Sequence, residues 1–311
     1  PPSNRNILVT GATGFTGRQV VPLLVERYRT VACLVRRSSN CAAIDLPGVT
    51  LLEGDLEDRA SLERALQGKD TLVSIAYLVG RTEHGPRLAK NIVGACRVAG
   101  VKRAVFVSSA SIFTTLSAPA KEAKLAAEDV VINSGLDYTI LRPTMIYGGP
   151  GDRNMIRLIR FLQRYPVVFV PGDGEGLQQP VHVEDLAKAI ADCLEVEATF
   201  GKAYNLSGAC PITFNEIVDQ SCLALGVKRI KVHLPLGLAL LAARLLNMTR
   251  RRGWIKEEQL LRLNEDKSID HSEARRDFGF SPRSFLEGIS REVAHASLQS
   301  LPAVDIRRTA S

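Results

Sequence analysis

Aromatic residues are scarce in this sequence of 311 residues, at 5% with a single Trp. This low aromatic content does not favour nucleic acid as a partner. The cysteines include no Cys-x-x-Cys pair, and no His lies at a spacing suited to zinc, so no metal site is predicted. We expect free thiols in a reducing compartment. The six cysteines are Cys33, Cys41, Cys96, Cys193, Cys210 and Cys222.

Long apolar runs are also missing. No run reaches the roughly 18 residues that a bilayer span requires, and the start of the chain has no signal-peptide pattern. Both features predict a cytoplasmic protein with no transmembrane segment. The apolar stretch 234–246 is followed by Arg250, Arg251 and Arg252. It is interpreted as a helix that packs under a lobe or against a partner subunit, with contact to a membrane surface as the alternative.

The charge balance is mildly basic. A net charge of +7 favours anions in general, but the basic residues are scattered except at 36–37, 250–252 and 307–308, so nucleic acid is not predicted as a partner. Hydrophobic content of 45% and charged content of 23% are typical of a soluble globular protein.

What the sequence does contain is an alternation of short apolar strands with helices, which predicts a doubly wound α/β fold with a parallel sheet. In such sheets ligands bind at the carboxyl ends of the strands. A loop at 147–152 marks the expected start of a smaller C-terminal lobe. Strands are predicted at 7–10, 31–35, 49–53, 71–76, 104–108 and 138–141, and helices after Phe15 and at 58–67, 85–99, 121–133, 154–164 and 186–194.

Three glycines follow the first strand with the spacing Gly-x-x-Gly-x-x-Gly. Gly11 and Gly14 would let the pyrophosphate of a dinucleotide approach the backbone, because no Cβ stands in the way. Gly17 would let the first helix lie close on the sheet, and the amides at a helix N-terminus attract anions. The stretch therefore predicts a Rossmann-type dinucleotide site. An ordinary glycine turn without a ligand is the alternative.

The end of the second strand bears on which nucleotide is bound. About 20 residues past the glycines of a dinucleotide fold, an acidic residue binds the adenosine ribose, whereas Arg accommodates a 2′-phosphate. Arg36, with Arg37 beside it, predicts NADP over NAD because a guanidinium can donate two hydrogen bonds to one phosphate. The alternative is that both arginines lie in a loop exposed to solvent and bind no ligand. Asp55, after the third strand, is placed to touch the adenine edge or to be the N-cap or turn residue before the next helix.

Several motifs together resemble the extended and atypical short-chain dehydrogenases/reductases, over residues 5 to about 295. The resemblance is to the epimerase/dehydratase branch, which acts mainly on nucleotide sugars. Relatives include dihydroflavonol and 3β-hydroxysteroid-type reductases and regulators that bind the cofactor without turnover. The motifs are Thr10 to Gly17, Gly54-Asp55-Leu56, Val107 to Ser111, Lys124 with Ala127-Glu128, Leu141-Arg142-Pro143, Pro180 to Asp185, and the closing segments 268–270, 274–282 and 286–289.

The resemblance implies an NAD(P)-binding domain over 1–146 and a mainly substrate-binding lobe over 147–296. It also implies that segments at about 177–205 return to the sheet. A flexible tail is expected over 297–311, because the periodicity fades there. The expected cofactor-binding residues are Gly11, Thr13, Gly14, Phe15, Thr16, Gly17, Arg36, Arg37, Asp55, Leu56, Ala76, Tyr77, Ser108, Lys124 and Pro143.

The catalytic pair is where the sequence departs from this family. The family uses Tyr-x-x-x-Lys on one helical face, and the tyrosine exchanges a proton with the substrate while hydride moves to or from the nicotinamide. Alignment on Lys124 places Ala120 at the tyrosine position, and alanine cannot transfer a proton. Ser109 matches the serine that orients the reacting oxygen, with binding of local backbone as the alternative. Ser109 and Lys124 are therefore the predicted catalytic residues.

Three explanations for Ala120 are open from the sequence. Another group supplies the proton, with Ser111, Lys121, Tyr77 and Tyr147 as candidates. Alternatively, the chemistry needs little acid catalysis, or the protein binds NADP as a non-catalytic regulator or assembly factor.

Two residues near the returning segment are interpreted as structural. We expect His182 to brace the fold rather than to act as a catalytic imidazole. Asp185 is expected to start the helix 186–194.

The sequence thus predicts an NADP-dependent oxidoreductase or epimerase, with NAD as the other cofactor. Its expected partner is a small carbonyl or hydroxyl substrate, with a nucleotide sugar favoured, and a homodimer is left open.

Overall fold

The computed structural model describes residues 5–28, 30–76, 84–116, 119–149, 151–152, 155–249 and 257–299. The chain forms two compact units, each assembled from three segments. The chain therefore enters each unit more than once, and the second return to unit 1, at 267–283, had not been predicted. Unit 1 comprises Pro1–Ile146, Gln179–Pro211 and Lys267–Arg283, and unit 2 comprises Tyr147–Gln178, Ile212–Asp266 and Ser284–Ser311.

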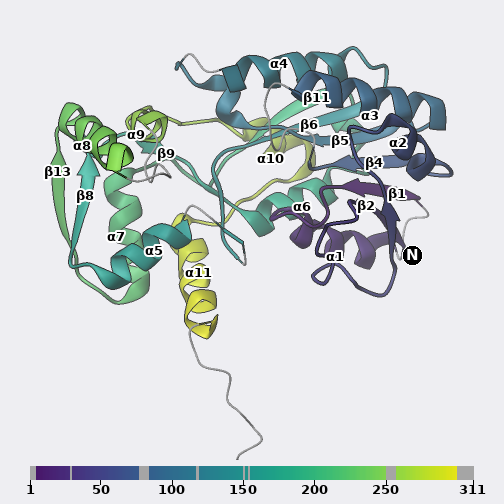
Figure 1. The fold of residues 1–311 in the computed structure, drawn as a ribbon. Coiled ribbons are helices and arrows are strands. Elements are labelled where there is room, and N and C mark those ends of the chain that lie inside the picture. The colour runs from purple at the N-terminus through teal and green to yellow at the C-terminus, as the bar shows by residue number, and fades with distance from the viewer. Residues whose placement is uncertain are drawn as a thin grey trace, which may run out of the picture. The chain divides into compact units, whose positions relative to one another are not determined.

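Unit 1 is built on a seven-stranded sheet in the order β11-β6-β5-β4-β1-β2-β3 (Figure 1). All neighbouring strands in it are parallel, which confirms the predicted doubly wound α/β fold. The strands are β1 (Ile7–Thr10), β2 (Val31–Val35), β3 (Val49–Glu53), β4 (Thr71–Ser74), β5 (Arg103–Val107), β6 (Asp137–Pro143) and β11 (Lys202–Leu206).

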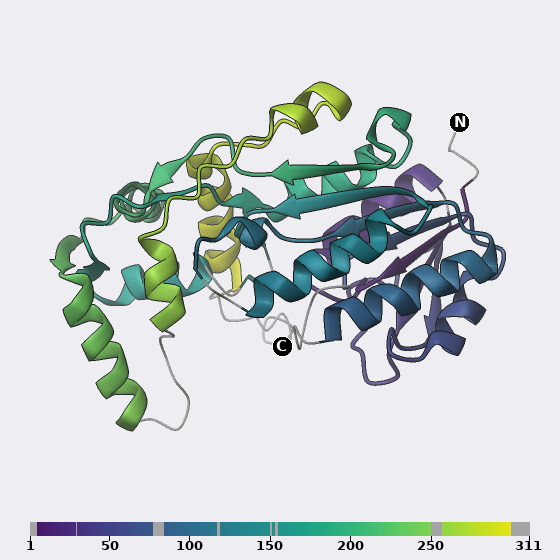
Figure 2. The ribbon, with the colours of Figure 1, turned by 90° about the horizontal axis from the view of Figure 1, so that it is seen from above.

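The central strands are apolar along their length because helices cover both faces of the sheet. Ile7 and Val9 of β1 belong to a core that includes residues of α1, α6 and α10. Leu8, on the other face, belongs to a core with α2, α3 and α4. Figures 1 and 2 show these helical layers, with α3 and α4 lying next to each other over the strands. The helices are α1 (Gly17–Tyr28), α2 (Arg59–Leu66), α3 (Gly85–Ala99), α4 (Pro119–Ile132), α6 (Val183–Asp192) and α10 (Ser272–Phe278).

The strand order reverses next to β1. From β1 the chain runs outward through β2 and β3, and it then crosses back to β4 on the other side of β1. At such a switch point the loops that follow the two strands diverge and leave a crevice at their carboxyl ends. The glycine loop that follows β1 therefore lies where this fold binds ligands.

Unit 2 contains two short sheets and five helices among its described residues. The parallel pair is β8 (Val167–Pro171) with β13 (Ile230–Leu234), and the antiparallel pair is β9 (Leu177–Gln178) with β12 (Ile212–Thr213). Helix α11 (Phe285–Gln299) packs against α7 (Phe214–Leu225) and α5 (Met155–Arg164), and α8 (Leu236–Thr249) packs against α9 (Glu257–Leu263). The remaining short elements are β7 (Ile146–Tyr147), β10 (Val181–His182) and the 3₁₀ turns η2 (Ala110–Phe113) and η3 (Glu197–Thr199).

Helix α6 begins earlier than the sequence predicts. Asp185 was expected to start it, but the helix starts at Val183 and its N-cap is His182, whose Nδ1 accepts the amide of Glu184 at 3.3 Å. His182 is buried in this bracing role. Asp185 instead accepts two N–H groups of the Arg283 guanidinium, at 3.0 and 2.9 Å. The Asp at this position therefore joins α6 to the segment before α11, rather than capping a helix.

None of the described helices is both long enough and apolar enough to cross a membrane. The apolar stretch that begins at residue 234 forms α8, a helix of 14 residues.

Candidate functional site

The glycine loop after β1 requires glycine for steric reasons. Gly11 has φ +77°, and a Cβ at this position would lie 2.7 Å from the Cβ of Ala76. A Cβ at Gly17 would lie 2.2 Å from the carbonyl oxygen of Gly11. The loop is closed by a hydrogen bond from the Gly14 amide to that same oxygen at 3.0 Å. The first turn of α1 can therefore approach the end of β1 closely only with glycine at these positions.

This loop fits the pyrophosphate of a dinucleotide. The amides in the first turn of a helix have no acceptor within the helix and carry the positive end of the helix dipole. Arg18, in the first turn of α1, adds a guanidinium whose Nε donates to the Thr13 carbonyl at 2.9 Å. Arg18 was not predicted as a site residue, although a basic residue directly after the third glycine is a signal that could have been noticed.

The loop after β4 lies against the glycine loop. The Ile75 amide donates to the Thr10 carbonyl at 3.1 Å, and the hydroxyl groups of Thr10 and Ser74 are 3.2 Å apart. Ala76 therefore lies beside Gly11, as expected of a residue lining the switch point. Tyr77, another expected cofactor residue, lies outside the described residues.

The ends of β2 and β3 are joined by a hydrogen bond from the Gly54 amide to the Val35 carbonyl at 3.0 Å. Arg36 and Arg37 follow β2 and are exposed, so both guanidinium groups are available to a ligand. Asp55 is exposed and accepts the Glu57 amide at 2.9 Å. Asp55 is therefore a turn residue, because the N-cap of α2 is Asp58. Leu56 is partly buried beside the α2–α3 core.

A buried carboxylate organises the end of β5. Glu128 of α4 is 2% exposed and accepts the hydroxyl of Ser108. It also forms an ion pair with Arg142 of β6, at 2.5 Å between Nη2 and Oε2. The Arg142 guanidinium lies 5.7 Å from the ring centre of Phe113. Ser108, one of the expected cofactor residues, therefore directs its hydroxyl to Glu128. Pro143, another expected cofactor residue, comes directly after Arg142 in the sequence.

A lysine–serine pair lies beside it. Lys124 of α4 donates to the hydroxyl oxygen of Ser111 at 2.8 Å. Ser109 accepts the Ser111 amide at 3.2 Å and caps the short η2 turn. This binding of local backbone was the alternative to a role in orienting the reacting oxygen. Ala120 lies one helical turn before Lys124 on α4. The structure thus places a hydroxyl next to the lysine, but it comes from η2 rather than from α4.

Two other proposed proton donors are hydrogen-bonded elsewhere. The ammonium group of Lys121 donates to the Thr114 carbonyl at 2.8 Å. Tyr147 belongs to unit 2, is 1% exposed, and its hydroxyl donates to the Phe285 carbonyl at 3.4 Å. Among the proposed proton donors that the structure describes, Ser111 is therefore the residue that contacts Lys124.

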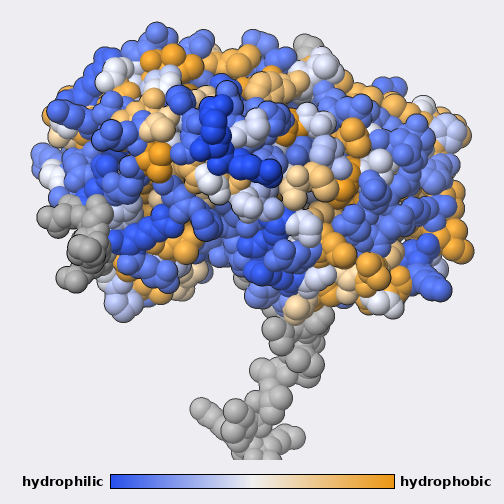
Figure 3. Space-filling model, turned by 180° about the vertical axis from the view of Figure 1, so that it is seen from behind, coloured by the Kyte–Doolittle hydropathy of each residue, from blue (hydrophilic) through white to orange (hydrophobic). Residues whose placement is uncertain are grey.

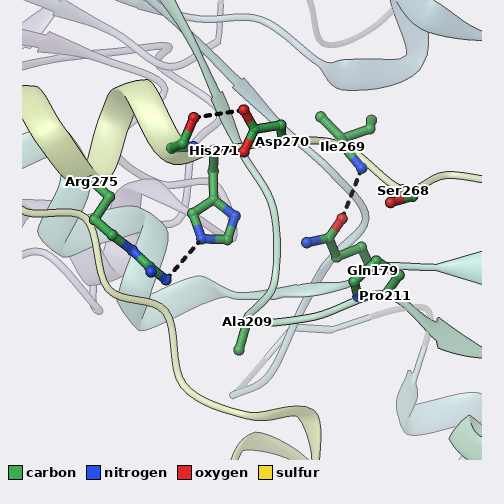
Figure 4. Close-up of a pocket in the computed structure, with 9 residues that line it drawn as sticks. Gln179, Ala209, Pro211, Ser268, Ile269, Asp270, His271 and Arg275 are labelled. Atoms are coloured by element: carbon green, nitrogen blue, oxygen red, sulfur yellow. Dashed lines mark hydrogen bonds between the residues drawn. The ribbon is translucent and has the colours of Figure 1, made fainter.

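A hollow in unit 1 was not predicted from the sequence. It has a volume of about 390 Å³ and lies beside the edge strand β11 (Figure 4). His271 is buried there, and its Nδ1 lies 2.7 Å from the hydroxyl of Ser207. Burial lowers the pKa of His271. The lining residues are Gln179, Ala209, Pro211, Ser268, Ile269, Asp270, His271, Ser272 and Arg275.

Unit 2 holds one strongly perturbed carboxyl. Glu292 of α11 is 3% exposed and accepts the Gly149 amide. Burial raises its pKa to about 7, in spite of this hydrogen bond, which lowers it. No cluster of His, Cys, Asp and Glu suited to a metal ion is present in the described part of either unit.

Comparison with known proteins places this geometry in context. A family model described as NAD(P)H-binding matches residues 11–197, the part of the chain that holds the glycine loop, Ser111 and Lys124. The match confirms the predicted cofactor class, although it does not distinguish NADP from NAD.

Two curated relatives extend along most of the chain. The 2-alkyl-3-oxoalkanoate reductase of Stenotrophomonas maltophilia is 28% identical over 92% of this chain and 97% of its own length. The 3beta-hydroxysteroid-dehydrogenase/decarboxylase isoform 1 of Arabidopsis thaliana is 26% identical over 99% of this chain and 84% of its own. These relatives confirm the resemblance to the extended short-chain dehydrogenases/reductases.

Solved structures agree on the fold. A dTDP-glucose 4,6-dehydratase from Streptomyces venezuelae, with NAD bound, has a TM-score of 0.72 and 23% identity, and the match covers 94% of this chain and 97% of that one.

Proposed function

The chain belongs to the NAD(P)H-binding family, within the extended short-chain dehydrogenases/reductases, and from this premise we propose an oxidoreductase in which Ser111 and Lys124 replace the usual tyrosine–lysine pair. The family includes NAD(P)-dependent oxidoreductases, epimerases and dehydratases. The observation that carries the proposal is the hydrogen bond of 2.8 Å from the Lys124 ammonium to the Ser111 hydroxyl oxygen.

The cofactor would be held at the switch point of the sheet. Gly11 and Gly14 would provide the close approach to the backbone that a diphosphate requires, Gly17 lets α1 lie close to the end of β1, and Arg36 and Arg37 would bind a 2′-phosphate. When bound, a nicotinamide cofactor supplies or accepts the hydride. The remaining task of the chain is to position the substrate oxygen and to supply or remove one proton.

Ser111 is suited to that proton transfer because of how its oxygen is used. Lys124 donates to the Ser111 oxygen, so the hydroxyl proton of Ser111 can be directed at a further acceptor. In a reduction, the Ser111 proton would pass to the substrate oxygen, Lys124 would return a proton to Ser111, and Lys124 would regain its own proton from solvent. The positive charge of Lys124 stabilises the serine oxygen at the moment it loses its proton.

The substrate class has two candidates. The names of the two relatives describe enzymes of an alkyl oxoalkanoate and of a hydroxysteroid, and these relatives align along nearly the whole chain. They favour an apolar carbonyl or hydroxyl compound. A nucleotide sugar, favoured by the branch the sequence resembles, is the second candidate, supported by the fold of the dTDP-glucose dehydratase.

The experiment is a screen of NADPH oxidation against 3-oxo acids, 3-ketosteroids and nucleotide sugars, repeated with Ser111→Ala and Lys124→Met. Loss of one proton donor costs about 10²- to 10⁴-fold in rate, so Ser111→Ala is expected to lower kcat by at least about a hundredfold with NADPH affinity unchanged. Lys90→Met, on the exposed face of α3, is the matched control and should leave kcat within about twofold. Full activity of Ser111→Ala would disprove the assignment.

A non-catalytic role is the alternative that Ala120 favours, because the usual proton donor is missing there. In that case NADPH would bind and raise the melting temperature, but no compound of the three classes would be turned over.

A further inference from the structure

Strand β13 exposes apolar residues that alternate with polar ones. Lys231 and His233 bond residues of α7 near the surface, namely Asp219 at 2.7 Å and Asn215 at 3.0 Å. The apolar residues that alternate with them, Ile230 and Val232, are 65% and 37% exposed. Surface strands normally place polar residues outward and apolar residues inward.

The neighbouring strand continues this apolar face. Phe169 of β8 pairs in register with Val232 and is 57% exposed. Val168, which alternates with Phe169, is buried against Val218 of α7. One face of the two-stranded sheet therefore forms the core of unit 2, and the other presents apolar side chains to solvent.

Aromatic side chains at the end of α5 extend this surface. Phe161 and Tyr165 stack with ring centres 4.8 Å apart, and both are exposed. The Ile230 amide donates to the Pro166 carbonyl at 3.0 Å, which joins the end of α5 to the start of β13. We call the exposed set Phe161, Tyr165, Phe169, Ile230 and Val232 the apolar strip. Figure 3 shows that apolar surface also gathers in patches between polar regions on the face it draws.

The charged residues of α5, which carries Phe161 of the apolar strip, are of one sign. Residues 155–172, which include α5 and β8, contain Arg157, Arg160 and Arg164 and no Asp or Glu. The three arginines are exposed. In β13 and α8, by contrast, Lys231 and Arg244 are paired with Asp219 and Glu257.

Helix α8 adds a further apolar face. Ala239 and Ala243 pack against Leu260 of α9, whereas Leu238 and Leu241 are 57% and 52% exposed. Leu234, at the end of β13, packs beside the same cluster. The exposed leucines therefore follow directly on the apolar strip along the chain.

We propose that the apolar strip docks unit 2 on an anionic lipid surface. Amphipathic rings prefer the headgroup region of a membrane, and aliphatic side chains can insert below it. Basic residues near the surface of an anionic bilayer add attraction of about 1 kcal/mol each. A second copy of the chain fits less well, because a symmetric pairing of this face would bring its cations together. Such docking is independent of the reaction proposed above.

The test is flotation of the full-length protein with vesicles of phosphatidylcholine alone or mixed with phosphatidylserine. We expect binding to the mixed vesicles only, and weaker binding at high salt because ions screen the attraction. The charge-reversal variant Arg160→Glu/Arg164→Glu should lower the partition coefficient at least about twentyfold, since one unit of charge is worth about fivefold. Phe169→Glu/Val232→Glu should abolish binding.

Leu223→Glu is the matched control, because Leu223 lies on α7 and is 67% exposed but is not part of the strip. It should bind vesicles like the unmodified protein. The melting-temperature rise with NADPH verifies that each variant is folded and also keeps this test separate from that of the reaction. Absence of binding to mixed vesicles would overturn the proposal. So would a strip variant that converts a dimer to a monomer while vesicle binding persists.

Discussion

The two units of this protein use their charges and strands in different ways. In unit 1 the central strands β1, β4 and β5 are buried on both faces, and the buried Glu128 is paired with Arg142 and Ser108. In unit 2 the β8–β13 pair is covered on one face only, and the buried Glu292 has an amide as its partner instead of a cation. The buried carboxylate of unit 1 is therefore neutralised by a cation, whereas unit 2 has a buried carboxyl with a raised pKa and a sheet face that exposes apolar side chains.

The largest effect is expected from Gly17→Val. The added side chain would begin 2.2 Å from the Gly11 carbonyl oxygen, and backbone cannot move aside as a flexible side chain can. We expect the free energy of unfolding to fall by more than about 4 kcal/mol and NADPH binding to be lost. Denaturant unfolding and calorimetric titration would measure both.

The control for this variant is Gly237→Ala in α8 of unit 2, where nothing lies within 4 Å of the new Cβ. It should be neutral or slightly stabilising, because Ala favours a helix over Gly by about 1 kcal/mol. If Gly17→Val bound NADPH normally, the steric basis of the loop would be refuted.

Glu128→Ala should have the next largest effect. It leaves the partly buried Arg142 without its partner, and removal of one member of a buried pair costs about 3–5 kcal/mol. The double variant Glu128→Leu/Arg142→Met removes both charges and should lose much less. Urea unfolding of both variants tests this, and equal losses would show that packing around Glu128, rather than its charge, stabilises the end of β5.

Arg36→Asp should affect the cofactor without affecting the fold, because Arg36 is exposed. A charge-assisted contact to phosphate is worth about 1.5–3 kcal/mol, so NADPH affinity should fall by about ten- to a hundredfold while NADH affinity stays the same or rises. Titration calorimetry with both nucleotides is the measurement. Equal affinities in the unmodified protein would remove the argument for a 2′-phosphate site.

The smallest predicted effect concerns unit 2 and pH. Burial raises the pKa of Glu292 to about 7, so the folded state holds this proton more tightly than the unfolded state does. Stability should therefore fall as pH rises from the ordinary pKa of 4.5 through 7, with no further loss above that. Glu292→Gln should flatten this part of the curve of unfolding free energy against pH. A variant curve parallel to that of the unmodified protein would count against the shift.

The difference between the units also decides how much could be predicted from sequence. The central strands and the glycine loop were predictable, because strands buried on both faces are continuous apolar runs and a close backbone approach demands glycine. The position of Ala120, four residues before Lys124, was likewise visible from sequence. These features depend on local residue types, which a sequence displays directly.

Other features depend on contacts between distant segments. The Lys124–Ser111 hydrogen bond joins α4 to η2. It could not be predicted from the residue types or from their spacing in the sequence. Asp185 looked like a helix start, but its partner Arg283 lies nearly a hundred residues away. The outward apolar face of β13 was missed because an alternating strand has the same pattern whichever face is buried.

The threading of the chain through its units has a consequence for biosynthesis. Strand β11 and helices α6 and α10 complete unit 1, yet they come from Gln179–Pro211 and Lys267–Arg283. A ribosome must therefore release most of the polypeptide before the nucleotide-binding sheet can gain its last strand. Helix α6 leaves the ribosome before β11 and helix α10 after it, so the face of the nascent sheet that α1 covers gains its last helix only after residue 278 has emerged.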